Sequence, residues 1–259
     1  MSEITKPVYI FENNNLKKIK KILKRHSYWA LFLDFDGTLA HFTEDPNKTK
    51  PLTGIANILN KIVSYDFINL VIISGRKLED LKKKIKLKNN TYYAGLHGLE
   101  MDKFSPKLKP QDNFIKTIKN KIRKSAFFTD EVKLEDKGGV LSIHHTSSYK
   151  HKNELKIFIK NNISKEYKVM EGRQIIEIKP KNWDKGKAVM FLLRKFKYNP
   201  LPIYIGDDTT DEDAFEVIEN ITIHVKNEDE LKTKASYYLH DPVEVKEFLK
   251  IFLDIANKK

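Results

Sequence analysis

The sequence predicts an α/β fold in which a doubly wound parallel sheet carries an inserted α+β unit. Four short apolar runs, at 28–33, 68–73, 91–94 and 201–205, each end in a polar or glycine-containing cluster. Continuous apolarity without alternation suits strands that are buried on both faces, as in a parallel sheet. Helical periodicity between these runs, and a different, alternating pattern in residues 104–182, complete the basis for the prediction. The expected core is therefore Rossmann-like.

Amphipathic helices are predicted between the core strands. Residues 53–63 and 185–196 carry apolar side chains at helical spacing. Strands that alternate with helices imply βαβ units and a doubly wound sheet. The alternation continues to the C-terminus in two apolar runs and a helical stretch, at 221–225, 236–239 and 242–255. We therefore assign residues 1–103 and 183–259 to one core domain.

Residues 104–182 are predicted to form the inserted domain. A helical stretch precedes two alternating runs that are separated at Gly138-Gly139, and adjacent glycines are a strong hairpin signal. A second helical stretch precedes another pair of runs, which turns near Gly172. The resulting αββαββ order predicts a small antiparallel sheet with helices on one face.

Alternation along the inserted strands predicts a polar sheet face, because successive side chains of a strand point to opposite faces. The residues expected to share such a face within their own strands are Lys133, Glu135 and Lys137; Ser142, His144 and Thr146; and Arg173, Ile175, Glu177 and Lys179. Alternation alone leaves open whether this face binds a ligand or is simply exposed to solvent.

Composition excludes several classes of protein. The 259 residues include no cysteine, which excludes a disulfide framework, a thiolate metal site and a cysteine nucleophile. The first thirty residues lack the sustained apolar stretch of a signal peptide. No segment has the roughly 18 apolar residues that a membrane span requires. We expect a cytoplasmic, monomeric protein with no membrane partner.

The net charge of +13 raises the question of nucleic-acid binding. The basic residues are nearly all lysines, and segments such as 17–25, 82–86 and 120–124 place them among isoleucine and leucine at helical spacing. This pattern is typical of the solvent-exposed side of an amphipathic helix. We expect no nucleic-acid partner; a basic nucleic-acid-binding module, which would bind DNA in a salt-sensitive manner, is the alternative from another functional class.

Polar and acidic residues follow the predicted core strands at the points where the strands end. Ligands of open α/β sheets bind beyond the carboxyl ends of the strands, so these residues should converge on one crevice. They are Asp34, Asp36, Gly37 and Thr38; Ser74, Gly75 and Arg76; and Gly206, Asp207, Asp208 and Asp211.

This collection is heavily acidic, and carboxylates that are packed together repel one another. A divalent cation removes the repulsion, and an all-oxygen site suits Mg²⁺. The candidate metal ligands are Asp34, Asp36, Asp207, Asp208 and Asp211. Helix capping would account for one or two acids of the segment 207–213, but not for the whole group.

Four motifs resemble those of the haloacid dehalogenase superfamily of phosphatases. They are DFDGTL at 34–39, ISGR at 73–76, the Lys185-Gly186 pair at a helix start, and GDDTTDED at 206–213. Each motif is weak alone, but their order and strand-end placement match throughout. The insertion between the second and third motifs corresponds to the type-two cap of that superfamily.

This resemblance implies a Mg²⁺-dependent phosphatase that forms an aspartyl-phosphate. Asp34 would be the nucleophile, and Asp36 would protonate the departing oxygen and later deprotonate water. Ser74 and Lys185 would hold the phosphoryl oxygens, together with backbone amides around Gly37 and Gly75. The implied metal ligands are Asp34, Asp207 and the backbone carbonyl of Asp36, with Asp208 or Asp211 in outer contacts.

Further segments resemble the trehalose-6-phosphate phosphatase subfamily. They are GLHGLE at 95–100, EDKGGVLSIHH at 135–145, EGRQIIEIKP at 171–180, NWDKGKAV at 182–189 and GDDTTDEDAF at 206–215. The resemblance implies that Glu135, Lys137 and Glu177 bind the disaccharide, and that His97 and Glu100 lie in the loop after the third core strand. Together with Gly37, Thr38, Gly75 and Arg76, these are the candidate substrate-binding residues. Arg76 could equally form a salt bridge within its loop.

The sequence differs from the subfamily at one place in the cap. Residues 144–146 read His-His-Thr where His-Tyr-Arg is usual. The alternative substrate is therefore another sugar phosphate, such as sucrose 6-phosphate or a mannosyl phosphoglycerate. A catalytically silent regulatory protein is a further alternative, disfavoured because both aspartates of the first motif are present.

Overall fold

A computed structural model describes residues 6–43, 45–88, 90–104, 106, 112–172, 174–227 and 232–259 of the chain. The chain forms two compact units. The first, here called the core unit, comprises Met1–Pro106 and Asp184–Lys259, and the second, the cap unit, comprises Lys107–Trp183. Among the described residues, no helix has the length and apolar character that crossing a membrane requires.

The core unit is built on an eight-stranded sheet with the order β1-β12-β11-β10-β2-β3-β4-β5. All neighbouring strands are parallel except β4 and β5, which are antiparallel. The strands are β1 (Val8–Tyr9), β2 (Trp29–Leu33), β3 (Ile68–Ile73), β4 (Tyr92–Gly95), β5 (Glu100–Met101), β10 (Leu201–Gly206), β11 (Ile221–Val225) and β12 (Tyr237–Leu239). This mostly parallel sheet confirms the predicted α/β fold class.

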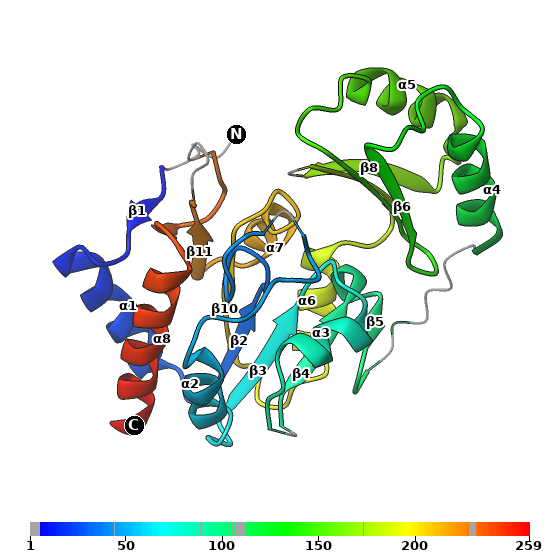
Figure 1. The fold of residues 1–259 in the computed structure, drawn as a ribbon. Coiled ribbons are helices and arrows are strands. Elements are labelled where there is room, and N and C mark those ends of the chain that lie inside the picture. Colours follow the sequence, from blue (N-terminus) through cyan, green and yellow to red (C-terminus); the bar gives the residue numbers. More distant parts are fainter. Residues whose placement is uncertain are drawn as a thin grey trace. The chain divides into compact units, whose positions relative to one another are not determined.

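Helices accompany the core strands, as Figure 1 shows. They are α1 (Asn13–Arg25), α2 (Ile55–Ile62), α3 (Leu78–Lys84), α6 (Lys185–Leu193), α7 (Glu212–Val217) and α8 (Pro242–Asn257), with a short 3₁₀ helix η1 (Leu96–Gly98). Helix α2 contacts α8, and α6 contacts α7. In α1, Ile19 and Leu23 are buried while Lys17, Lys21 and Lys24 are exposed, as predicted for an amphipathic helix.

The side chains of β2 alternate between two apolar clusters, which explains the continuous apolar run in the sequence. Leu31 and Leu33 belong to the large core cluster that includes residues of α2 and α8. Phe32 points to the other face of the sheet, where its ring lies near those of Tyr204 and Phe196. Because both faces of β2 are covered, all five of its residues are buried.

The cap unit has the predicted αββαββ order. Its four-stranded antiparallel sheet has the order β6-β7-β9-β8. The elements are α4 (Asp112–Arg123), β6 (Val132–Asp136), β7 (Leu141–His145), α5 (Lys152–Asn162), β8 (Tyr167–Gly172) and β9 (Ile175–Pro180). Both helices and one face of the sheet contribute to a separate apolar cluster, with Ile118 of α4, Ile159 of α5 and Ile143 of β7 among its members. The cap unit therefore has a hydrophobic core of its own.

Candidate active site

The candidate site lies at the carboxyl ends of three adjacent core strands. Asp34 follows β2, Ser74 follows β3 and Asp207 follows β10, and these strands are neighbours in the order β10-β2-β3. Parallel strands present their carboxyl ends at the same edge of a sheet. The three motifs, although distant in sequence, therefore meet in space.

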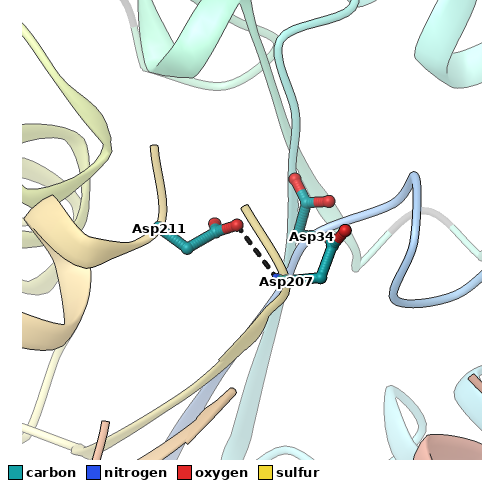
Figure 2. A group of neighbouring side chains, drawn as sticks. All are labelled: Asp34, Asp207 and Asp211. Atoms are coloured by element: carbon teal, nitrogen blue, oxygen red, sulfur yellow. Dashed lines mark hydrogen bonds between the residues drawn. The ribbon is translucent and has the colours of Figure 1, made fainter. Parts of the chain in front are cut away.

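Three carboxylates from this edge form the acidic cluster, which we define as Asp34, Asp207 and Asp211. Each offers an oxygen atom, and these atoms lie within 4.8 Å of one another. Figure 2 shows the carboxylates of Asp34 and Asp207 side by side, and that of Asp211 turned toward the backbone of Asp207. Asp34 and Asp211 are buried, whereas Asp207 is partly exposed.

The acidic cluster holds more negative charge than the protein itself neutralises. Burial raises the pKa of Asp34 well above its usual value, and Asp211 adds repulsion that Lys185 opposes. Burial is also the largest cause that raises the pKa of Asp207. Repulsion from Asp34 is the next largest, and repulsion from Asp211 comes third. Ionisation of both Asp34 and Asp207 is therefore costly unless a cation is bound.

Lys185 is the cation that the chain supplies to this cluster. Its Nζ donates hydrogen bonds to Oδ1 of Asp34 at 2.7 Å and to Oδ1 of Asp211 at 2.6 Å. Burial alone would lower the pKa of Lys185, but Asp211 and Asp34 outweigh it, so that the pKa is raised. As the first residue of α6, which is preceded by the N-cap Asp184, Lys185 is fixed in place by the start of a helix.

Asp211 orients its neighbours through both of its carboxylate oxygens. Oδ1 accepts from Lys185 and, at 2.6 Å, from the hydroxyl of Tyr204. Oδ2 accepts from the backbone N–H groups of Asp207 at 3.2 Å and Asp208 at 3.0 Å. Tyr204 is a functional candidate that sequence reasoning missed, since it reads as one more apolar residue of β10.

Replacing Tyr204 with phenylalanine should lower turnover roughly tenfold, because Asp211 loses a donor that fixes the carboxylate bound to Lys185; the free energy of unfolding should fall by about 1–3 kcal/mol, the cost of removing one donor from a buried charged acceptor. The ring of phenylalanine still fills the space, so the protein should remain folded. Steady-state kinetics and thermal unfolding measure the two effects. Tyr198→Phe is the matched control, since Tyr198 is 68% exposed in the loop before β10. Wild-type turnover in Tyr204→Phe would contradict an orienting role for the hydroxyl.

Asp207 is held by two side chains and restricts one glycine. Thr38 donates to Oδ1 of Asp207 at 3.2 Å, and Nδ2 of Asn227 donates to Oδ2 at 3.4 Å and to the carbonyl of Gly37 at 3.2 Å. Gly37 has φ +75°, and a Cβ atom there would lie 1.9 Å from Oδ2 of Asp207, so only glycine fits. Sequence reasoning also missed Asn227; its one signal is that it follows β11, another strand of the same sheet.

Arg76 and Asp36 form a bidentate ion pair. Nε of Arg76 donates to Oδ2 of Asp36 at 2.7 Å, and a terminal nitrogen donates to Oδ1 at 2.6 Å. Arg76 also donates to Asp80 and to the carbonyl of Pro46, both at 2.8 Å. The sequence left open a salt bridge within the loop of Arg76; the contact with Asp80 is local, whereas the bidentate pair joins Arg76 to the loop after β2. Proton transfer by Asp36 would require that Arg76 release its carboxylate.

The two other predicted metal ligands take part in different contacts. The side chain of Asp36 binds Arg76, as described above. Oδ1 of Asp208 accepts from the backbone and hydroxyl of Thr209, at 2.7 and 3.2 Å, and burial raises the pKa of Asp208. The acidic cluster nevertheless fits a hard divalent cation. Its donors are all oxygen atoms, and the single positive charge of Lys185 does not balance three carboxylates.

The second motif and the loop after β4 are linked. Ser74 is buried, its carbonyl accepts from the backbone N–H of His97 at 2.9 Å, and its Oγ accepts from that of Arg76 at 3.2 Å. The ring of His97 packs against Gly75, since a Cβ atom at Gly75 would lie 3.0 Å from its Cε1. His97, in the loop after β4, therefore lies against the second motif.

Glu100 has a structural contact. Its Oε2 accepts a hydrogen bond from the backbone N–H of Leu78, the first residue of α3, at 2.8 Å. A carboxylate at this position satisfies a free N–H group and interacts favourably with the helix dipole. Glu100 therefore stabilises the start of α3.

The three candidate residues of the cap unit form one network. Nζ of Lys137 lies 3.4 Å from Oε1 of Glu177 and 4.0 Å from Oε2 of Glu135. Lys137 and Glu177 are buried. The three cap candidates thus lie close to one another. The core candidates Asp34, Lys185 and Asp207 form a second group, within the core unit.

Comparisons with known proteins point to one family. Residues 32–243 match the family model described as Trehalose-phosphatase. The chain is 33% identical to trehalose 6-phosphate phosphatase RA3 of Zea mays over 263 residues, which covers 89% of this chain and 70% of that protein. It is 28% identical to trehalose-phosphate phosphatase B of Arabidopsis thaliana, with 88% and 67% covered.

Solved structures share the fold. The C-terminal domain of the trehalose-6-phosphate phosphatase of C. albicans superposes with a TM-score of 0.80 at 22% identity, covering 98% of this chain and 99% of that chain. A trehalose-6-phosphate phosphatase related protein superposes with a TM-score of 0.70 at 23% identity, covering 89% and 100%.

Proposed function

This chain belongs to the trehalose-phosphatase family and is a phosphatase, and we propose that it hydrolyses trehalose 6-phosphate to trehalose and inorganic phosphate. The observation that carries the proposal is the position of Asp34, a buried carboxylate held by Lys185 beside Asp207. The relatives that this chain matches are trehalose-phosphate phosphatases, which supports the choice of ester. A phosphatase of another sugar phosphate is the second candidate, because of the His-His-Thr sequence at 144–146.

Asp34 would attack phosphorus in line, forming an O–P bond while the bond to the sugar oxygen breaks. The product of this step is an aspartyl-phosphate, which water then hydrolyses. Lys185, fixed between Asp34 and Asp211, would stabilise the negative charge on the transferring phosphoryl oxygens. Ser74 and the backbone amides near Gly37 and Gly75 would add donors around the same oxygens.

Asp36 would act as the acid and base. It would protonate the departing sugar oxygen and later take a proton from the attacking water. Arg76 holds its carboxylate by two hydrogen bonds, so the ion pair must open before Asp36 reaches the substrate. Arg76 would move to the phosphate when the substrate binds. It would then serve as an ion-pair partner in the free enzyme and as a substrate-binding residue in the complex.

Mg²⁺ is the proposed cofactor. Asp34 and Asp207 would supply carboxylate oxygens and Asp36 its backbone carbonyl, while Asp208 and Asp211 would make outer contacts. When bound, the ion would supply the positive charge that the buried carboxylates and the phosphoryl group require. Thr38 and Asn227 would orient Asp207 for this purpose.

Glu135, Lys137 and Glu177 are the proposed sugar-binding residues of the cap unit. Ionised side chains form strong hydrogen bonds with hydroxyl groups, and trehalose presents many hydroxyls. These residues would therefore recognise the sugar part of the substrate, while the core residues act on the phosphate.

A substrate panel tests the proposed function. We expect phosphate release from trehalose 6-phosphate to exceed that from sucrose 6-phosphate, a mannosyl phosphoglycerate and glucose 6-phosphate by at least about tenfold in kcat/KM, or roughly 1.4 kcal/mol of transition-state discrimination. An aryl phosphate, p-nitrophenyl phosphate, reports the core chemistry without a sugar. Comparable kcat/KM values for all sugar phosphates would contradict the assignment of the substrate.

Removal of the metal should abolish turnover, and Mg²⁺ should restore it. Because the ion would bind the folded protein, Mg²⁺ at roughly a hundred times its Kd should raise the free energy of unfolding by about 2.7 kcal/mol. Activity after chelation with EDTA and thermal unfolding with and without Mg²⁺ measure these effects. Asp207→Asn should lose the stabilisation, whereas the exposed Asp66→Asn should retain it. Full activity in EDTA would contradict the proposed cofactor.

A further inference from the structure

We infer that Ser142 and His144 are positioning residues, which orient the two cap carboxylates Glu177 and Glu135 toward sugar hydroxyls. This inference rests on the proposed function, because it concerns how the same cap residues recognise the substrate. It assigns a role to two polar residues of β7, one of which lies in the segment that departs from the subfamily pattern.

The strand register places Ser142 between the two carboxylates. β7 lies between β6 and β9, and Ser142 is opposite Glu135 on one side and opposite Glu177 on the other. Directly paired residues of an antiparallel sheet have their side chains on the same face, with Cβ atoms about 5 Å apart. His144 is two residues further along β7 and therefore shares this face.

The side chains are connected by hydrogen bonds and ion pairs. Oγ of Ser142 donates to Oε1 of Glu177 at 2.7 Å, and Nζ of Lys137 lies 3.4 Å from the same oxygen. Lys137 is also 4.0 Å from Oε2 of Glu135, and Nε2 of His144 lies 3.1 Å from that atom. One oxygen of each carboxylate thus accepts a hydrogen bond from a residue of β7 and lies within ion-pair distance of Lys137.

Burial shows that Ser142 serves this network rather than solvent. Ser142 is fully buried, and Glu177 is 7% exposed. A buried hydroxyl group is unfavourable unless it has a hydrogen-bond partner. Ser142 carries no charge, so it leaves the charge of Glu177 unchanged and fixes its direction. Lys137 supplies the only positive charge among the five side chains of this network when His144 is neutral.

Orientation matters because a carboxylate recognises a sugar through the geometry of its hydrogen bonds. A glutamate side chain has three rotatable bonds, and its ordering costs free energy unless neighbours fix it before the ligand binds. Binding groups that are supported by a surrounding shell of hydrogen bonds hold the geometry required for recognition. Removing such support should weaken sugar recognition and leave the reaction at phosphorus unaffected.

The test compares Ser142→Ala and wild type on trehalose 6-phosphate and on p-nitrophenyl phosphate. We expect kcat/KM for trehalose 6-phosphate to fall roughly tenfold, mainly through KM, as for loss of a hydrogen bond to a charged group. The value for p-nitrophenyl phosphate should stay within about twofold, since that ester has no sugar. Ser148→Ala is the matched control: Ser148 also donates to a glutamate, Glu131, at 2.7 Å, but at an exposed site of the cap unit. It should behave as wild type.

His144 provides an independent pair of variants. His144→Leu removes the ring nitrogen and should reduce kcat/KM for trehalose 6-phosphate severalfold, while His144→Gln retains an N–H donor and should recover most of it. If Ser142→Ala does not fold, as judged by circular dichroism, the His144 pair decides the question. Equal losses on both phosphate esters, or no loss on either, would overturn the inference.

Failure of the proposed function gives a different result. A wild-type enzyme that prefers another sugar phosphate would overturn the trehalose assignment. The ratio of that sugar phosphate to p-nitrophenyl phosphate, measured in the same variants, would then decide whether Ser142 and His144 position the cap carboxylates.

Discussion

Replacing Asp34 with asparagine should abolish turnover of trehalose 6-phosphate while leaving the protein folded. The amide is not a nucleophile at phosphorus, so kcat should fall by roughly a thousandfold or more. The same change removes a buried negative charge whose pKa is raised by burial and by Asp211. The free energy of unfolding of the metal-free protein should therefore be maintained or increased.

Steady-state kinetics and denaturant unfolding measure these two effects separately. Asp66→Asn is the matched control, because Asp66 is exposed and lies outside the site. It should leave both quantities unchanged. Turnover in Asp34→Asn within about tenfold of wild type would contradict the assignment of the nucleophile.

Replacing Lys185 with methionine should lower both activity and stability. The substitution keeps a long apolar stem but removes the ammonium group that binds Asp34 and Asp211. Breaking a buried ion pair by removing one partner costs about 3–5 kcal/mol, because the remaining charge stays buried without compensation. Denaturant unfolding at neutral pH and steady-state kinetics check the prediction. Lys187→Met, at a half-exposed position of the same helix, is the control.

A second substitution distinguishes loss of charge pairing from a general packing defect. Adding Asp211→Asn to Lys185→Met removes one of the uncompensated carboxylates and should recover part of the lost stability. If the two substitutions instead destabilise additively, Lys185 and Asp211 are not coupled as the hydrogen bond between them requires.

Local sequence signals account for most of the fold. The run at 68–73 coincides with β3, because a strand buried on both faces leaves a continuous apolar signature. Gly138 and Gly139, both with positive φ, form the predicted turn between β6 and β7. The two-residue strands β1 and β5 were not predicted, since segments this short have no periodicity and depend on pairing with β12 and β4.

The acidic cluster was predictable because its members follow strand ends. Parallel topology alone brings Asp34 to Asp207, and Lys185 begins a helix at the same edge. A salt bridge within the loop of Arg76 was one of two alternatives, but its pairing with Asp36 of another loop was not predicted, and neither was the contact of Glu100 with α3. Such contacts depend on side-chain directions in loops, which no local pattern encodes.

Tyr204 and Asn227 likewise make contacts that could not be predicted from the sequence. The hydroxyl of Tyr204 is meaningful only because Asp211, seven residues later, turns back to accept its hydrogen bond. Asn227 donates a hydrogen bond to the carbonyl of Gly37, which is distant from it in the sequence. Their roles depend on tertiary structure, and apart from the position of Asn227 after β11, residue type and spacing give no sign of them.

Trapping the phosphorylated enzyme would show whether Asp34 is the nucleophile. The wild-type protein would be mixed with trehalose 6-phosphate and Mg²⁺, quenched in acid within the first turnover, and mapped by peptide mass spectrometry. We expect a phosphoryl group on the carboxylate of Asp34 and none in Asp34→Asn. Release of phosphate with the Asp34 peptide unmodified and the phosphoryl group on another residue would contradict it.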